Sequence, residues 1–367
     1  MEMIRAARNL INIALKPRTA SSLPIYLHVE PTNRCHLACI GCARDVVLEG
    51  SGDMPFDAYT RLIDDVKPQY VALNGIGEPV LHPRFFDMVR YAKARGAQVN
   101  TCSSMVLKAA DFEEFVLSGL DLLKVSLDGA TPATYQKLRG RDLHGRVLEG
   151  VAAVAKARQR HGIATPALRF NCLLVEDTLH EMEALIVLAR ELCVPAVIFQ
   201  PLESSSVEVR TRPLIENVDY DGFRALLVVA ARRADELKVE TNLDDLIGRF
   251  PVYWGKYRQD DRVEPDTTVC PMPWYSLYVN ASGVAQPCCK FSRYGETHGA
   301  LGNIVKDGPA AVWNGEAMQR LRDEFKHGVR RNQICQECVA LGPRAMVKRL
   351  AVLPSFSTSL AGAGRGR

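Results

Sequence analysis

Short runs of apolar and β-branched residues alternate with amphipathic stretches of helical period through the middle of the chain. The runs predict six strands, at 25–30, 70–74, 98–102, 122–127, 168–175 and 196–200. Apolar residues three and four positions apart predict helices between them, at 56–66, 83–95, 111–118, 143–158 and 179–192. Strands that alternate with helices favour parallel βα units. Six units are fewer than the eight of a complete barrel, so we expect an α/β fold with a partial, open (β/α)6 barrel.

The pattern changes on both sides of this region. Residues 1–15 have apolar positions at helical spacing. We expect this helix to pack on the main domain, and contact with a membrane surface is the less favoured alternative. After a further helix at 219–237, a hairpin at 277–287 and a helix at 310–327 are predicted in a cysteine-rich segment.

We therefore expect four parts along the chain. The tail is rich in Ser, Gly and Ala, which favours disorder towards its end. The parts are an N-terminal helical extension (1–24), the barrel (25–240), a small C-terminal domain (241–345) and the tail (346–367).

Composition excludes several classes of protein. The chain has 367 residues, of which 47% are hydrophobic and 24% charged, as in ordinary globular proteins. No stretch approaches the ~18 uninterrupted apolar residues of a membrane span. A net charge of +4 is too small to indicate nucleic acid, and we expect no nucleic-acid partner. Eleven cysteines without a signal-peptide cleavage pattern favour the cytoplasm and metal binding over disulfides.

Three of the cysteines, Cys35, Cys39 and Cys42, follow the first predicted strand. Zinc usually takes four ligands, and no fourth Cys or suitably spaced His follows nearby. Thiolates are soft donors that suit iron–sulfur clusters. Three thiolates on a four-iron cluster would leave one iron with an open coordination position.

This C-x3-C-x2-C spacing resembles the loop of the radical SAM superfamily. The resemblance implies a 4Fe–4S cluster that binds S-adenosylmethionine (SAM) at the open iron. Reductive cleavage of SAM then yields a 5′-deoxyadenosyl radical, which abstracts a hydrogen atom from the substrate. It also implies an electron donor such as flavodoxin or ferredoxin. Where the family often has a large residue, this chain has Gly41, so we expect adenine contacts from the backbone near Ile40 and Gly41.

The segment after the second strand, Asn-Gly-Ile-Gly-Glu-Pro at 74–79, is similar to the GGEP-type motif of the same family. Glycines at a strand end permit tight turns and close backbone approach to a ligand. The resemblance implies that this segment contacts the methionine amino group of SAM. The residues it assigns to that contact are Gly75, Ile76, Gly77 and Glu78.

The fourth strand ends in Ser-Leu-Asp-Gly at 126–129, which resembles the family run near the SAM ribose and carboxylate. Ser126 and Asp128 are therefore candidate SAM contacts, with capping of the next helix as the alternative for Asp128. Arg139 pairs with a carboxylate or is an exposed residue at a helix end. Asn171 faces the pocket from the fifth strand or is a buried, hydrogen-bonded residue. Cys102, at the end of the third strand, is a weak catalytic candidate.

Four cysteines form a second group near the C-terminus: Cys270, Cys288, Cys335 and Cys338. Four thiolates describe a closed site, which fits structural zinc or a 4Fe–4S cluster equally well. The order C-x12-G-x4-C, a gap and C-x2-C resembles the SPASM/twitch extension of radical SAM enzymes. That resemblance implies a small cluster-binding domain with one auxiliary 4Fe–4S cluster. We expect Cys289 to be a buried small residue, with a hydrogen-atom donor as the weaker alternative.

Spacing and motifs indicate how a radical is generated but do not reveal its substrate. Our leading hypothesis is an oxidoreductase-type enzyme that oxidises or epimerises a small oxygenated molecule, such as a sugar, an aminocyclitol or a secondary-metabolite intermediate. Modification of a ribosomal peptide is the alternative, and the lack of an obvious peptide-recognition domain before residue 25 weighs against it. A non-catalytic zinc-binding scaffold is the alternative of another class.

Overall fold

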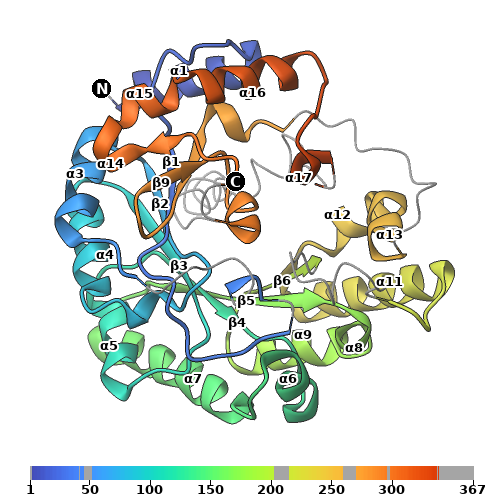
Figure 1. The fold of residues 1–367 in the computed structure, drawn as a ribbon. Coiled ribbons are helices and arrows are strands. Elements are labelled where there is room, and N and C mark those ends of the chain that lie inside the picture. Colours follow the sequence, from blue (N-terminus) through green and yellow to red (C-terminus); the bar gives the residue numbers. More distant parts are fainter. Residues whose placement is uncertain are drawn as a thin grey trace, which may run out of the picture.

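The computed structural model describes residues 2–40, 42–44, 52–201, 215–258, 270–295, 298–336 and 338. A single ten-stranded sheet forms its core, in the order β10-β9-β8-β1-β2-β3-β4-β5-β6-β7 (Figure 1). All neighbours from β8 through β1 to β7 are parallel, and β9 is antiparallel to β8 and β10. The strands are β1 (Tyr26–Val29), β2 (Tyr70–Leu73), β3 (Gln98–Ser103), β4 (Leu122–Ser126), β5 (Ala167–Leu174), β6 (Ala196–Pro201), β7 (Glu240–Thr241), β8 (Ser276–Val279), β9 (Val284–Gln286) and β10 (Gly302–Asn303).

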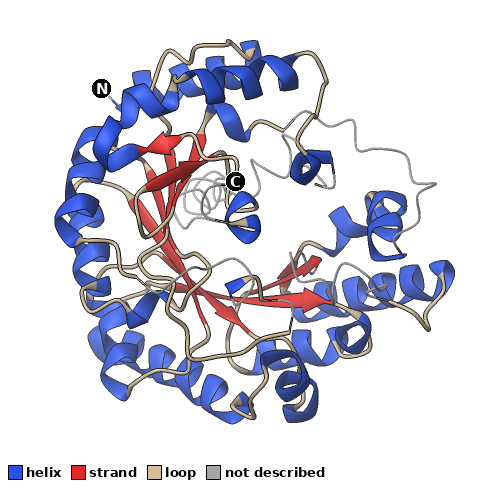
Figure 2. Cartoon of the chain, viewed as in Figure 1, coloured by secondary structure: helices blue, strands red, loops and turns tan. Residues whose placement is uncertain are grey.

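The sheet curves into an open arc, and helices cover its outer face (Figure 2). The outer helices are α3 (Phe56–Val66), α4 (Phe85–Ala94), α5 (Ala109–Leu117), α6 (Pro132–Arg139), α7 (His144–His161), α8 (Glu176–Leu179), α9 (Met182–Glu191) and α11 (Tyr220–Leu237). The prediction of a partial barrel with six βα units is confirmed. The six predicted strands agree with the observed ones to within one residue at each end.

Strand alternation gives the sheet two chemically different faces. Val125 on β4 and Phe170 on β5 are fully buried in the core between the sheet and its helices. Their neighbours Lys124, Arg169 and Asn171 are half-buried and belong to the opposite, inner face, because successive residues of a strand point to opposite sides. The inner face of the arc is therefore rich in hydrogen-bonding groups.

The C-terminal region extends the same sheet. β8 pairs in parallel with β1, and Tyr278 stands opposite His28 in the register. Two helices, α12 (Leu243–Gly248) and α13 (Phe250–Arg258), precede this region along the chain. The domain boundaries at 24/25 and 240/241 stay predictions, and the expected tail at 346–367 lies outside the described residues.

The N-terminal helix is present as α1 (Glu2–Leu15), and its Ile13 packs against the buried cluster that contains Trp274. Asn9 and Asn12 are buried, and both donate from Nδ2 to Ser22 Oγ, at 3.0 and 3.2 Å. The segment after the helix turns back and supplies this acceptor. The apolar Leu10 and Leu15 are 63% and 69% exposed.

The helix predicted at 310–327 is divided into α15 (Pro309–Trp313) and α16 (Glu316–Lys326). The break lies at Asn314, whose side chain accepts from Ala20 N at 3.0 Å and donates to Ala20 O at 3.1 Å. This tertiary contact interrupts the helix at Asn314. The helical pattern therefore predicted one element that is longer than either observed helix. Two further short helices, α14 (Ile304–Asp307) and α17 (Gln333–Gln336), complete the C-terminal region.

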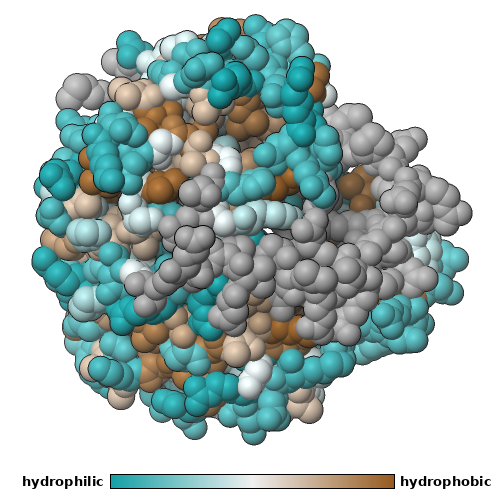
Figure 3. Space-filling view, in the orientation of Figure 1, coloured by the Kyte–Doolittle hydropathy of each residue, from teal (hydrophilic) through white to brown (hydrophobic). Residues whose placement is uncertain are grey.

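Hydrophilic residues cover much of the outer helices on the face shown in Figure 3. Among the described residues, no helix combines the length and apolar character needed to cross a membrane.

Arg322 on α16 joins three parts of the chain. Its side chain is fully buried, and the guanidinium donates to Pro273 O at 2.9 Å, Asn314 Oδ1 at 2.8 Å and Arg18 O at 3.2 Å. We predict that Arg322→Ala lowers the free energy of unfolding by about 3 kcal/mol, since buried acceptors lose charged donors. Thermal unfolding of anaerobic protein measures the loss. Arg320→Ala, on the exposed side of the same helix, should change it by less than about 0.5 kcal/mol.

Candidate functional site

The motifs singled out in the sequence meet at one edge of the sheet. The three-cysteine loop follows β1, the glycine segment follows β2 and the Ser-Leu-Asp-Gly run ends β4. Because these strands are parallel, their C-terminal ends lie at the same edge, where ligands bind in open α/β sheets. The topology therefore brings together residues that are up to a hundred positions apart.

The glycine segment packs backbone to backbone against the cysteine loop. Glu78 N donates to Arg34 O at 2.8 Å. A Cβ atom added at Gly77 would lie 2.4 Å from Thr32 O and 2.7 Å from Arg34 O, which is closer than real Cβ atoms approach. Gly77 is therefore required by the close approach of the two loops.

Glu30, the residue after β1, connects three elements below these loops. The side chain is 1% exposed, and Oε2 accepts hydrogen bonds from Ile76 N at 2.7 Å and Tyr278 Oη at 2.9 Å. Burial raises the pKa of Glu30, and these donors oppose the rise. A Cβ added at Gly75 would lie 2.1 Å from Oε2, so this glycine makes room for the carboxyl group.

The role of Glu30 was not predicted from the sequence. The available signal was an acidic residue at the end of an apolar strand, directly before the cysteine loop. Its partner Tyr278 lies 248 positions away, so only the fold reveals the contact.

One oxygen of the Glu78 carboxyl group is available to accept a hydrogen bond from a ligand. Its side chain is 3% exposed, and Oε2 accepts from Ser104 N at 2.7 Å. Oε1 is buried and has no hydrogen-bond partner within the part of the chain that the structure describes. A buried carboxylate oxygen of this kind fits a cationic donor such as an ammonium group. The residues present thus fit the amino group of SAM, and a direct contact stays a prediction.

Asp128 and Arg139 form a buried ion pair beside the cysteine loop. Asp128 Oδ2 lies 2.5 Å from Arg139 Nη2, and Asp128 Oδ1 accepts from Leu173 N at 2.7 Å. The side chains are 1% and 14% exposed, so Arg139 is not the exposed helix-end residue considered above. Thr131, not Asp128, caps α6. Arg139 Nη1 also donates to Cys39 Sγ at 3.6 Å.

The remaining candidates lie along the inner face of the sheet. Cys102 Sγ lies 3.2 Å from Ser126 Oγ. Asn171 stands opposite Ser126 in the register of β4 and β5, and its Oδ1 accepts from Arg169 Nε at 3.1 Å. The structure brings Cys102, Ser126 and Asn171 to neighbouring strands, and their roles stay predictions.

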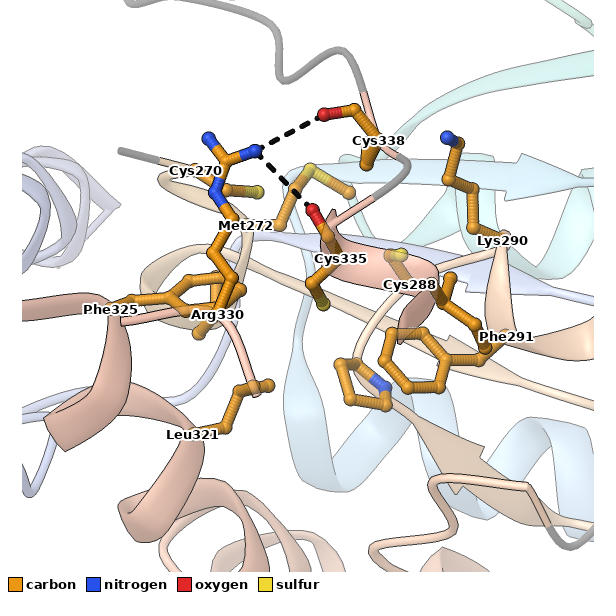
Figure 4. A pocket seen from close by; sticks show the side chains of 13 residues that line it. Cys270, Met272, Cys288, Lys290, Phe291, Leu321, Phe325, Arg330, Cys335 and Cys338 are labelled. Atoms are coloured by element: carbon orange, nitrogen blue, oxygen red, sulfur yellow. Dashed lines mark hydrogen bonds between the residues drawn. The ribbon is translucent and has the colours of Figure 1, made fainter. Parts of the chain in front are cut away.

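The second group of cysteines lines one pocket. Figure 4 shows these cysteines together, although Cys270 and Cys338 are far apart in the sequence. Apolar side chains including Phe291 and Phe325 form the rest of the wall. The four cysteines that line the pocket are the four predicted ligands Cys270, Cys288, Cys335 and Cys338.

The chemistry of this pocket fits a metal cluster that supplies positive charge. Burial raises the pKa of Cys270 and of Cys335 to about 12, and it also raises the pKa of Cys288 well above its usual range. Thiols in such surroundings become thiolates when a metal compensates the charge. Arg330 Nη1 donates to Cys335 O at 3.3 Å and to Cys338 O at 3.2 Å, which holds the C-x2-C segment against the pocket.

Cys289 is not among the described residues that line this pocket. It is half-buried, so the expectation of a fully buried residue is wrong. Within the described ranges, no three His, Cys, Asp or Glu side chains converge at the spacing of a single metal ion.

An open barrel with a three-cysteine loop at one strand end and a four-cysteine pocket beside it defines an iron–sulfur radical enzyme. Comparison with family models agrees: the radical SAM superfamily model matches residues 29–188, and an iron–sulfur cluster-binding domain, SPASM, matches residues 270–339. The chain belongs to the radical SAM superfamily and carries a C-terminal SPASM domain. Its cofactors are SAM, the 4Fe–4S cluster that activates SAM and an auxiliary 4Fe–4S cluster.

Two curated relatives illustrate the similarity. The chain is 28% identical over 202 residues to the tungsten-containing aldehyde ferredoxin oxidoreductase cofactor-modifying protein of Pyrococcus furiosus, covering 54% of this chain and 55% of that protein. It is 30% identical over 181 residues to the PqqA peptide cyclase of Ruegeria pomeroyi, covering 48% and 46%. The chain thus spans about half the length of these relatives.

A solved structure shows the same fold. SuiB of Streptococcus suis, crystallised with its precursor peptide SuiA, superposes with a TM-score of 0.64 at 14% identity, covering 94% of this chain and 76% of SuiB.

These relatives correct the substrate hypothesis. The expectation of a small oxygenated molecule, with a small molecule favoured over a peptide, is wrong, because a PqqA peptide cyclase and a peptide-bound SuiB are among the matches. The hypothesis failed because the chemistry of radical generation is shared by enzymes with different substrates. The family matches also exclude the zinc-binding scaffold.

We predict that Gly77→Ala separates the glycine segment from the cysteine loop. The added methyl group has to displace backbone atoms of Thr32 and Arg34, and such overpacking costs about 1–3 kcal/mol. SAM affinity should fall about tenfold or more in reconstituted protein, as measured by equilibrium binding at matched iron content. Gly145→Ala is the control, because a Cβ there meets no atom within 4 Å. Unchanged SAM affinity in Gly77→Ala would contradict the packing argument.

Proposed function

We propose that the protein is a radical SAM enzyme that oxidatively modifies a residue of a ribosomally made peptide. The observation that carries this proposal is the similarity to the PqqA peptide cyclase, an enzyme whose name states a peptide substrate. The fold shared with a peptide-bound enzyme is consistent with it.

The proposed roles of the site residues follow from their positions. Cys35, Cys39 and Cys42 hold the cluster that activates SAM, and the 74–79 segment and Ser126 orient SAM at the strand ends. When bound, these cofactors supply a 5′-deoxyadenosyl radical. The chain itself fixes the geometry: Gly77 permits the close approach of the two loops, and Glu30 accepts a hydrogen bond from Ile76 N.

The polar inner face supports a peptide substrate. Lys124 donates to Asn100 Oδ1 across neighbouring strands, and Arg169 donates to Asn171. Amides and cationic donors of this kind match the carbonyl and amide groups of an extended peptide. An apolar inner face would leave the carbonyl and amide groups of a bound peptide without hydrogen-bond partners.

The four-cysteine pocket supports an oxidative outcome. Four protein thiolates leave no open coordination position, so the auxiliary cluster is suited to electron transfer and not to direct binding of substrate. Oxidation of the peptide then removes two electrons. The first would leave with a hydrogen atom taken by the SAM-derived radical. The second would be accepted by the auxiliary cluster held by Cys270, Cys288, Cys335 and Cys338, while the accompanying proton would pass to water.

We predict different losses for the two cysteine sites. Cys39→Ala should abolish formation of 5′-deoxyadenosine, because the activating cluster loses one of its three ligands. Cys335→Ala should retain uncoupled SAM cleavage but lose peptide product. Liquid chromatography of 5′-deoxyadenosine, with iron analysis of each variant, measures both effects. The exposed Cys193 provides the control, and Cys193→Ser should behave as the unmodified protein. Product formation by Cys335→Ala would remove the auxiliary site from the mechanism.

The substrate class is tested with peptides encoded by short open reading frames beside the gene. Synthetic peptides are incubated anaerobically with the reconstituted protein, SAM and a reductant, and analysed by mass spectrometry. We expect a loss of about 2 Da in one peptide and stimulation of SAM cleavage. A protein that cleaves SAM but leaves every such peptide unmodified, with no stimulation, would contradict the peptide proposal.

A further inference from the structure

Arg139 lies between an anionic side chain and a cysteine of the radical SAM loop. Its Nη2 pairs with Asp128 Oδ2 at 2.5 Å, and its Nη1 donates to Cys39 Sγ at 3.6 Å. The side chain is 14% exposed, so solvent screens these interactions only in part. The guanidinium thus has a fixed carboxylate on one side and a prospective cluster ligand on the other.

Backbone contacts hold this arrangement from both sides. Ile40 N donates to Leu138 O at 2.9 Å, one residue from each partner of the Arg139–Cys39 contact. A Cβ at Gly140 would lie 2.5 Å from Ala38 O, so the end of α6 meets the cysteine loop at backbone distance. These contacts fix the backbone on either side of the Arg139–Cys39 contact, and the pairing with Asp128 holds the guanidinium.

A hydrogen-bond donor and a positive charge beside a cluster sulfur change the reduction potential of the cluster. Hydrogen bonds to cluster sulfurs, local charge and burial set the reduction potential of iron–sulfur clusters. Reduction adds one negative charge, which a nearby guanidinium stabilises, so the potential becomes less negative. Asp128 acts in the opposite sense through its charge, while its pairing orients Arg139.

We infer that Arg139 is a positioning residue that raises the reduction potential of the SAM-activating cluster through Cys39, and that Asp128 orients it and offsets part of its charge. The step concerned is the transfer of one electron to the cluster from an external low-potential one-electron donor, with no bond formed or broken. The inference concerns the activation of SAM and does not depend on the peptide substrate.

The test is a redox titration of the reconstituted full-length protein without SAM. It follows the electron paramagnetic resonance signal that changes when SAM is added afterwards, which belongs to the cluster with the open iron. Arg139→Gln removes the charge, Asp128→Asn removes the opposing charge, and Arg141→Gln is the matched control. Arg141 is exposed and donates to His36 O of the same loop at 3.3 Å, but not to a cysteine.

We expect opposite shifts in the two variants. Arg139→Gln should decrease the ratio of reduced to oxidised cluster about tenfold at a fixed poise, equivalent to about 59 mV for a one-electron couple. Asp128→Asn should increase the ratio, and Arg141→Gln should leave it unchanged. Iron content is matched before each titration, so loss of the cluster is not mistaken for a change in potential.

Two results would overturn the inference. One is an unchanged midpoint in Arg139→Gln together with weaker SAM binding, which would make Arg139 a SAM contact only. The other is a shift of the same sign in Arg139→Gln and Asp128→Asn, which general disruption of the loop would produce. If Arg139→Gln does not retain the cluster, the titration of Asp128→Asn decides: a higher midpoint supports the inference and an unchanged one refutes it.

Discussion

The pairing of β1 with a strand on each side is the constraint on which the rest of the structure depends. β1 lies between β2 of the barrel and β8 of the C-terminal region, and all three run parallel. Their C-terminal ends consequently meet at one edge, and Glu30 accepts hydrogen bonds there from Ile76 and Tyr278. One buried carboxyl group thus connects the segment proposed to bind SAM with the region that holds the auxiliary cluster. The segments that carry the two groups of cysteines are thus connected to one continuous sheet.

Close packing between backbones fixes the positions of the loops at this edge of the sheet. The glycine segment and the end of α6 both meet the cysteine loop at distances that leave no room for a Cβ at Gly77 or Gly140. Contacts between backbones vary less than contacts between long side chains, because they lack rotamer freedom. The three-cysteine loop is therefore placed by its neighbours on two sides, although the described residues from Cys35 to Cys42 form no helix or strand.

Buried charge is concentrated where the cofactors act. Glu30, Asp128 and Arg139 lie near the strand ends, and burial raises the pKa of both carboxyl groups. The thiols of the C-terminal pocket are buried among apolar side chains, which raises the pKa of Cys270, Cys288 and Cys335. Such groups are expensive to desolvate without partners, so their concentration indicates sites of function and not of stability.

The sequence by itself determined the partial barrel and its six strands, because strand alternation is a local property. The spacing of the cysteines also nominated the ligands of two clusters, and those ligand roles stay predictions. It also indicated radical SAM chemistry, through the resemblance of its C-x3-C-x2-C loop and the motifs at the following strand ends to those of that superfamily. Only the tertiary structure decided that Arg139 pairs with Asp128, that Tyr278 reaches Glu30, that α1 exposes Leu10, and that Asn314 interrupts a helix. These outcomes depend on contacts between distant segments, which no local pattern encodes. The preference for a peptide substrate came from relatives, because the inner face of the barrel is assembled from single residues on separate strands.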